Sequence, residues 1–209
     1  MVDVEIDKDL VEVFPEIYLS TREVETVVRP SIGLEDQVSK IRAGIHYSLE
    51  SLKDNPIIRA FRDFYWRIGI DPTKIRPASE ALVRRILSGS SLPAINNVVD
   101  AGNLASAETL IPIGLYDLDK IVGRLVLRFA RIGEEFTDIT GKVKKLEGNT
   151  IVLSDDLGIV HIFPHRDSLR TMIGWDTRRV LIIGCGVKNI PRELVDKAVD
   201  RVIDYLKIL

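Results

Sequence analysis

Short polar side chains recur at helical spacing between residues 93 and 107, where they could be presented to a ligand. If this stretch is a helix, Asn96, Asp100 and Asn103 lie within about 60° of one another on one face, from the 3.6-residue period. Asn and Asp each cost up to roughly 0.7 kcal/mol in a helix relative to Ala, so a solvated face usually carries Lys, Glu or Arg. These side chains are therefore aimed at a ligand or at a neighbouring backbone, or they form a buried polar anchor that holds a loop.

A second group of reactive side chains follows the apolar alternation that ends at Phe163. The run from His165 to Ser168 offers an imidazole, a guanidinium, a carboxylate and a hydroxyl just after a predicted strand, and loops at strand ends commonly carry function. His161 and His165 are four residues apart, but Pro164 and the alternation indicate a strand and a turn, where this spacing does not bring two imidazoles to one metal ion. The run is a polar site or an ordinary polar turn, and no metal site is predicted.

The cysteine Cys185 lies in the run IIGCGV, between two glycines that follow an apolar strand. A tight turn of this kind could project a nucleophile, but catalysis would also need a base within hydrogen-bond reach and an activated thiolate. The favoured interpretation is a cysteine that packs among small residues. A cysteine hydrolase formed by Cys185 and His165 stays open as a third hypothesis.

Composition restricts the class of partner. The chain has 209 residues, a net charge of -2 and a pI near 6.0, which argue against bulk, sequence-independent binding of nucleic acid but leave room for a local basic patch. A single cysteine excludes an internal disulfide framework and favours a reducing, cytoplasmic setting. The N-terminus is acidic and has no long apolar run, so neither a signal peptide nor a membrane span is expected.

The apolar periodicity predicts helices mainly in the first part of the chain and strands mainly in the second. Helices are predicted for residues 34–54, 56–68, 80–87, 93–107 and 192–209. Strands are predicted for residues 2–7, 16–29, 125–130, 142–145, 151–154, 159–163 and 179–183. Ser79 is the predicted cap of the third helix, and Asp117 is predicted to cap a short turn. This order indicates one α+β domain over residues 1–209, with an antiparallel meander in its second part.

Together these residues resemble a known family, the paired B3/B4 aminoacyl-tRNA editing domain of the phenylalanyl-tRNA synthetase β subunit. The matching positions run in order through Arg84 and Arg85, INNVVDAGN (Ile95 to Asn103), IPIGLYDLDKIVG (Ile111 to Gly123), the strand GRLVLRFA, Gly133 with Glu134, and Thr177 with Val180 to Ile182. The pair NNVVD and YDLDK at this spacing is specific. The resemblance places the core motifs in residues 76–209 and makes residues 1–75 an N-terminal elaboration with a strand and helices.

The resemblance implies an α+β fold with a mixed or antiparallel central sheet and flanking helices. In the synthetase, the corresponding pocket hydrolyses tyrosine mistakenly attached to the phenylalanine tRNA. A free-standing relative is therefore expected to bind the tRNA acceptor end or an aminoacyl-tRNA and to act as a deacylase in trans, without ligase activity and without a cofactor. The substrate-binding positions that match the family are Asn96, Asn97, Asp100, Asn103 and Asp117.

The chain departs from the family at the pocket itself. Gly114 stands where the family has a histidine, Ile183 where it has a pocket glutamate, and the Pro164-His165 neighbourhood where it has a glycine pair. The side chains expected to supply catalytic groups in their place are those of His165 and Ser168. Further substrate contacts are assigned to Gly114, Arg166 and Cys185, and contacts with acceptor-end phosphates to Arg84, Arg85 and Arg128.

Ester hydrolysis of this kind needs little beyond a positioned water and an oxyanion stabiliser. The near-zero net charge and the lost pocket positions favour an alternative from another class. In that alternative the chain is a non-catalytic module that binds a free amino acid, a similar small ligand or a protein partner.

Overall fold

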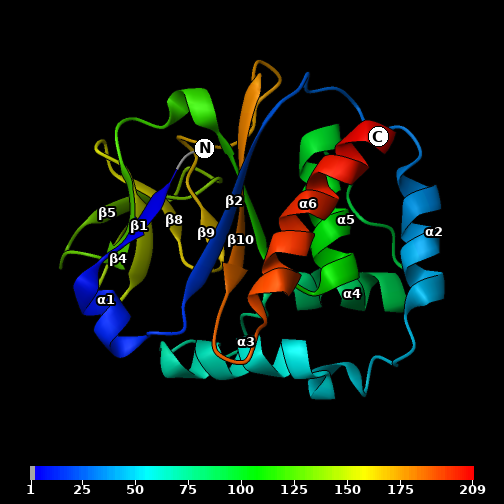
Figure 1. The fold of residues 1–209 in the computed structure, drawn as a ribbon, viewed down its shortest axis with the longest axis horizontal. Coiled ribbons are helices and arrows are strands. Elements are labelled where there is room, and N and C mark those ends of the chain that lie inside the picture. The colour runs from blue at the N-terminus through cyan, green and yellow to red at the C-terminus, as the bar shows by residue number, and fades with distance from the viewer. Residues whose placement is uncertain (1–2) are drawn as a thin grey trace.

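The computed structural model describes residues 3–209 and confirms the α+β class (Figure 1). Within these residues the strands form a five-stranded sheet of order β1-β4-β7-β8-β9, a three-stranded sheet of order β2-β10-β3, and a two-stranded sheet of β5 and β6. The meander β4-β7-β8-β9 is antiparallel, as predicted, but the predicted strands at residues 142–145 and 179–183 lie in the other two sheets, and β1 pairs with β4 in parallel. The five-stranded sheet is therefore mixed.

The helices are α1 (Lys8–Val13), α2 (Leu34–Gly44), α3 (Pro56–Arg67), α4 (Ala78–Leu87), α5 (Asn97–Thr109) and α6 (Arg192–Ile208), with 3-10 turns η1 (Leu52–Asp54) and η2 (Leu118–Lys120). The strands are β1 (Val4–Ile6), β2 (Tyr18–Glu25), β3 (Ile113–Asp117), β4 (Leu125–Phe129), β5 (Glu135–Thr137), β6 (Val143–Lys145), β7 (Ile151–Ser154), β8 (Ile159–Ile162), β9 (Arg166–Asp167) and β10 (Arg179–Gly186).

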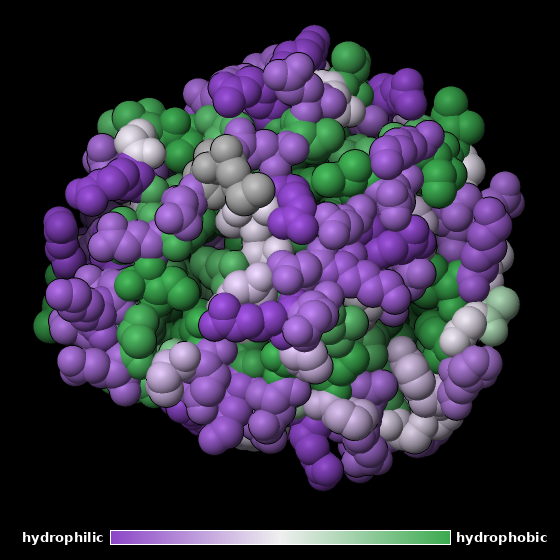
Figure 2. All heavy atoms as spheres, viewed as in Figure 1, coloured by the Kyte–Doolittle hydropathy of each residue, from purple (hydrophilic) through white to green (hydrophobic). Residues whose placement is uncertain are grey.

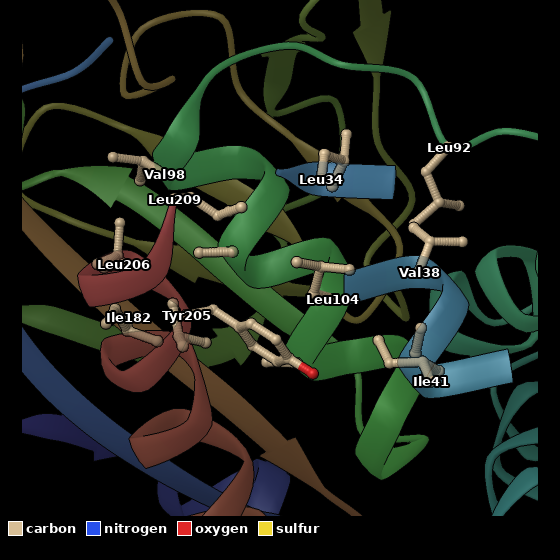
Figure 3. Close-up of a cluster of buried hydrophobic side chains, with 14 of the residues drawn as sticks. Leu34, Val38, Ile41, Leu92, Val98, Leu104, Ile182, Tyr205, Leu206 and Leu209 are labelled. Atoms are coloured by element: carbon tan, nitrogen blue, oxygen red, sulfur yellow. The ribbon is translucent and has the colours of Figure 1, made fainter. Parts of the chain in front are cut away.

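The three-stranded sheet separates two hydrophobic cores. Alternate residues of β10 face opposite sides, so Ile182 packs in the cluster under α5 and α6, and Ile183 packs in the cluster toward α3 and the five-stranded sheet. Figure 3 shows the first cluster, where Leu104 of α5 and Tyr205 of α6 lie beside side chains of α2. The same alternation in β3 directs Leu115 toward α5.

Several local predictions need correction. The helix predicted for residues 34–54 ends at Gly44, where Ile45 takes up an extended backbone, and Ser48 and Ser51 then form a turn before η1 by bonding to each other's backbone N–H groups. Ser79 is not a cap: α4 begins at Ala78, with Pro77 at the cap position. The prediction that Asp117 caps a short turn is confirmed, since its side chain accepts a hydrogen bond from the N–H of Asp119 at the start of η2.

The N-terminal segment contributes directly to the sheet. Strand β2 pairs with β10 along eight residues, from Tyr18 opposite Gly186 to Glu25 opposite Arg179. Hydrophilic residues predominate on the face seen in Figure 2, with hydrophobic residues interspersed among them. None of the helices in the described part of the chain has the length and apolarity needed to cross a membrane.

Candidate functional site

The polar stretch begins with a helix cap. Asn96 has an extended backbone, and its side-chain oxygen accepts hydrogen bonds from the N–H groups of Val98 at 3.1 Å and Val99 at 2.9 Å. The helix starts at Asn97, so Asn96 satisfies orphan N–H groups and does not lie on the helix face. This corrects the prediction that Asn96, Asp100 and Asn103 share one face.

Asn97 and Asp100 hold the segment of residues 27–31. The Asn97 amide donates to the carbonyl of Val27 at 3.1 Å and accepts from the N–H of Arg29 at 2.9 Å, while the side chain is only 1% exposed. Asp100 accepts from the N–H of Ile95 at 3.1 Å and from the Ser31 hydroxyl, and burial raises the pKa of its carboxyl. The polar groups of Asn97 and Asp100 are hydrogen-bonded within the protein, so the two side chains form a buried anchor that holds this segment against α5.

One turn further along α5, the helix borders a cavity of about 290 Å³. We refer to it as the α5–β9 cavity. Its lining comes from α4, α5, β3 and β9 and from the segments near residues 95, 139 and 172. The lining residues are Ala78, Leu82, Ile95, Val99, Gly102, Asn103, Ser106, Ile113, Leu115, Ile139, Asp167, Met172 and Ile173.

Three polar groups converge on this largely apolar cavity. Asn103 and Ser106 are one helical turn apart and line it together. Ser106 is 3% exposed, and its hydroxyl has no hydrogen-bond partner within residues 3–209, which is unusual for a buried polar group. Asp167 faces them from β9, with its Oδ1 2.8 Å from Nδ1 of His161. Apolar walls with a few convergent polar groups are typical of small-molecule sites.

The mouth of the cavity is apolar as well. Ile95, Ile139 and Met172 line it and remain 50%, 56% and 39% exposed, respectively. Large apolar side chains that cluster at a surface opening commonly mark a binding site. Gly102 lies close to the floor of the cavity: a Cβ atom there would lie 2.6 Å from Cδ1 of Leu115, so any larger residue would displace the Leu115 side chain.

Gly114 and Ile183, the positions at which the resemblance implies a lost histidine and a lost glutamate, face the other side of the three-stranded sheet. Gly114 of β3 and Ile183 of β10 are direct cross-strand partners, so the structure does bring them together. A Cβ atom at Gly114 would collide with the hydroxyl of Tyr116, a residue that is 2% exposed. The space over Gly114 is therefore filled by Tyr116, and Ile183 packs in the same hydrophobic cluster.

His165 and Ser168, the two predicted catalytic residues, do not lie in one site. Ser168 is buried, and its hydroxyl accepts a hydrogen bond from the N–H of Arg170 at 3.2 Å. His165 lines a different cavity, in which Ser168 has no part. Burial, followed by the nearby His161, Arg166 and Lys144, lowers the pKa of His165 to about 4. At neutral pH this imidazole is uncharged.

The lowered pKa of His165 predicts that protonation of this residue destabilises the folded protein in mild acid. The unfolded chain binds a proton at this residue below pH 6.5, the ordinary value, whereas the folded chain binds it only below about pH 4. This contribution therefore leaves stability unaffected above pH 6.5 and reduces it as the pH falls from 6.5 to about 4. We expect the melting temperature of His165→Gln to depend less steeply on pH between 6.5 and about 4 than that of the wild type. Equal slopes of melting temperature against pH in the two proteins would contradict the assignment of this effect to His165.

Cys185 is buried, and burial raises the pKa of its thiol to about 12. The thiol therefore stays protonated at neutral pH, which does not fit a nucleophile.

We expect the thiol of Cys185 to resist alkylation by iodoacetamide in the native protein and to react only when the protein is unfolded. We also expect the Cys185→Ala variant to keep any hydrolytic activity of the wild type. Rapid alkylation of the folded protein, or loss of activity in a folded Cys185→Ala variant, would revive the cysteine-hydrolase hypothesis.

The arginines assigned to RNA or substrate have partners within the protein. Arg128 makes a two-point ion pair with Glu134, with N···O distances of 2.7 and 2.9 Å. Arg84 bonds to the buried Glu80 at 3.1 Å, and Arg85 bonds to a backbone carbonyl. Arg166 bonds to Asp138 at 3.0 Å. Phosphate contacts by these groups would compete with existing bonds.

The sequence analysis considered His161 only as a metal ligand and Asp167 only as part of the run from His165 to Ser168, and it passed over Ser106. The cross-strand pairing of His161 with Asp167 was the accessible signal, because a β8–β9 hairpin brings the two side chains to one face. Ser106 gave no signal, since it lies in a run of small residues. No group of three or more His, Cys, Asp or Glu side chains in the described residues is arranged to hold a metal ion.

Comparisons with known proteins agree with this fold. The family model described as the B3/4 domain matches residues 60–209. The phenylalanine–tRNA ligase beta subunit of Bartonella henselae is 35% identical over 105 residues, which are 50% of this chain and 13% of that protein. The Yersinia pestis protein of the same name is 28% identical over 151 residues, 71% of this chain and 18% of that one. The chain thus spans a small part of these relatives.

A solved structure shares the whole fold. It is an N-terminal fragment of the phenylalanyl-tRNA synthetase beta subunit from Pyrococcus horikoshii, with a TM-score of 0.52 and 17% identity. The similarity covers 99% of this chain and 48% of that fragment.

Proposed function

Because this chain belongs to the B3/4 domain family, we propose that it binds the aminoacyl end of a charged tRNA in the α5–β9 cavity and hydrolyses the ester in trans, in the cytoplasm. The observation that carries the proposal is the convergence of Asn103, Ser106 and Asp167 on an apolar cavity of about 290 Å³. The similarity to phenylalanine–tRNA ligase beta subunits supports a role connected with tRNA.

The lining suggests how an aminoacyl group is held. The walls formed by Val99, Ile113 and Leu115 suit an apolar side chain. The unpaired Ser106 hydroxyl has free lone pairs that accept a hydrogen bond from the α-ammonium group. The Asn103 amide donates to the ester carbonyl oxygen and stabilises the oxyanion that develops there.

Asp167 supplies the base in this scheme. Its carboxylate lies between His161 and the cavity, and the imidazole holds it in one orientation. A water bound to Asp167 attacks the ester carbonyl carbon and gives its proton to the carboxylate. The proton then passes to the ribose oxygen as the ester bond breaks, and a free amino acid and an uncharged tRNA result.

The second candidate is a non-catalytic module that binds a free amino acid in the same cavity. The net charge of -2 and the internal bonds of Arg84, Arg128 and Arg166 favour it, because they leave these cations less available for phosphates. A module that binds a free amino acid needs only the cavity and no basic surface for phosphates.

We also propose that residues 1–75 and 76–209 act as one domain. Support comes from β2, which pairs with β10 along its whole length, and from Asn97, which bonds to the segment of residues 27–31. Removal of the N-terminal segment would uncover an edge of the central sheet.

Deacylation assays and calorimetry separate the two functions. We expect the protein to deacylate at least one tRNA in a panel charged with each natural and near-cognate amino acid, and Asn103→Ala to lose that activity while remaining folded. Calorimetric binding of a free amino acid without deacylation of any substrate would favour the ligand module. Absence of both would contradict the assignment of the cavity.

A further inference from the structure

A second cavity, of about 230 Å³, lies beside β9 and is lined by different residues. We refer to it as the Lys144 cavity. Successive residues of a strand point to opposite faces, so Arg166 lines this cavity and Asp167 lines the α5–β9 cavity. Its apolar side includes Ile68, Ile70 and Phe163, and the two cavities share no lining residue.

The polar end of the Lys144 cavity is basic. Lys144 of β6 makes no ion pair within residues 3–209, and Arg166 of β9 makes one, to Asp138, through one terminal nitrogen. No Asp or Glu is among the described residues that line the cavity. Two cations beside a concave, partly apolar surface attract an anion.

His165 adds a ring nitrogen without a hydrogen-bond partner to the lining of the Lys144 cavity, within the part of the chain that the structure describes. Its Nδ1 is buried without a hydrogen-bond partner in the described part of the chain. Burial and the positive charges of Arg166 and Lys144 lower its pKa, while Asp167 opposes this effect. The imidazole is therefore neutral at pH 7 and available to a ligand, as a donor or an acceptor according to its tautomer.

The volume restricts the size of the ligand. At about 230 Å³ the cavity is smaller than the roughly 300–1,000 Å³ of typical ligand pockets, so it suits a small ligand. The apolar walls favour a monoanion over a phosphate, because a more highly charged ion loses more hydration on entry. A carboxylate also matches the planar fork of arginine.

We infer that the Lys144 cavity binds a small aliphatic monocarboxylate, whose carboxylate lies between Lys144 and Arg166 and whose hydrocarbon chain lies against Ile68, Ile70 and Phe163. The inference does not depend on hydrolysis or on the α5–β9 cavity.

NMR titration of the full chain tests the inference, with the imidazole signals of His165 as the readout. The probes are 4-methylpentanoate, its neutral counterpart 4-methylpentanamide, and inorganic phosphate. We expect a saturable shift with the carboxylate alone, together with a raised pKa of His165, because the anion offsets the charges of Lys144 and Arg166. Equal responses to the amide or to phosphate, or no response to the carboxylate, would overturn the inference.

Substitutions on β6 provide a matched control. Lys144→Ala is expected to weaken carboxylate binding by about tenfold, the loss of one charge-assisted contact. Lys145→Ala is expected to leave binding unchanged, since alternation turns the next side chain to the other face and Lys145 does not line the cavity. Both residues are exposed, so both variants should fold. Equal affinities of Lys144→Ala and the wild type would contradict the site.

Discussion

Asn97→Ala is expected to lower the free energy of unfolding by about 3 kcal/mol. The substitution leaves the Arg29 N–H and the Val27 carbonyl without their side-chain partner, in a region where Asn97 is 1% exposed. Each of these two partly buried hydrogen bonds contributes about 0.5–1.5 kcal/mol, so their combined loss reaches about 3 kcal/mol. Equilibrium unfolding in urea, with the midpoint and slope fitted together, measures the change.

Asn103→Ala is the matched control, because it removes the same amide from the same helix. Asn103 lines the cavity and is only partly buried, so we expect its loss to change stability by less than about 1 kcal/mol while it impairs ligand binding. A reversed pattern, with Asn103→Ala strongly destabilising and Asn97→Ala neutral, would contradict the division between anchor and site.

Asp167→Asn is expected to lower the rate of deacylation by about 100-fold or more while the fold is kept. The amide has nearly the shape of the carboxylate but cannot accept the proton of the attacking water, and loss of a general base typically costs 10²–10⁴ in rate. The loss should fall on kcat, because Asn103 and Ser106 still hold the aminoacyl group. Single-turnover deacylation with a substrate from the charged-tRNA panel measures it.

Glu135→Gln serves as the control for a removed charge, since Glu135 is exposed on β5 and does not line the cavity. We expect its rate to equal that of the wild type. An unchanged rate in Asp167→Asn would exclude Asp167 as the base, and equal losses in both variants would indicate a general effect of net charge.

Periodicity predicted the elements that build the two cores. The apolar stripe of α6 and the alternation of β4 are strong local signals, and both elements lie close to their predicted bounds. Strand β3 was missed because Pro112 and Gly114 interrupt its pattern, and because hydrogen bonds to β10, a distant segment, stabilise it. Helix α1 was missed because six residues give too short a period.

The candidate site was harder to predict for a physical reason. Asn96, Asn97 and Asp100 stood out because polar residues are costly in a helix, yet local and tertiary backbone hydrogen bonds offset that cost. The polar groups of the cavity come from α5 and β9, which are far apart in the sequence. Only the tertiary fold places Asp167 opposite Asn103 and Ser106. Composition and spacing carry no information on that placement.

The most direct test of the central claim is an NMR titration of the α5–β9 cavity with a non-hydrolysable aminoacyl-adenosine, in which an amide replaces the ester and the amino acid is leucine. The account predicts saturable shifts at the side-chain amide of Asn103 and at the backbone amides of Gly102, Ser106 and Asp167, with Asn97 and Cys185 unaffected. Shifts centred on Gly114, Ile183 and Cys185, or saturable binding that leaves Asn103 unshifted, would contradict it.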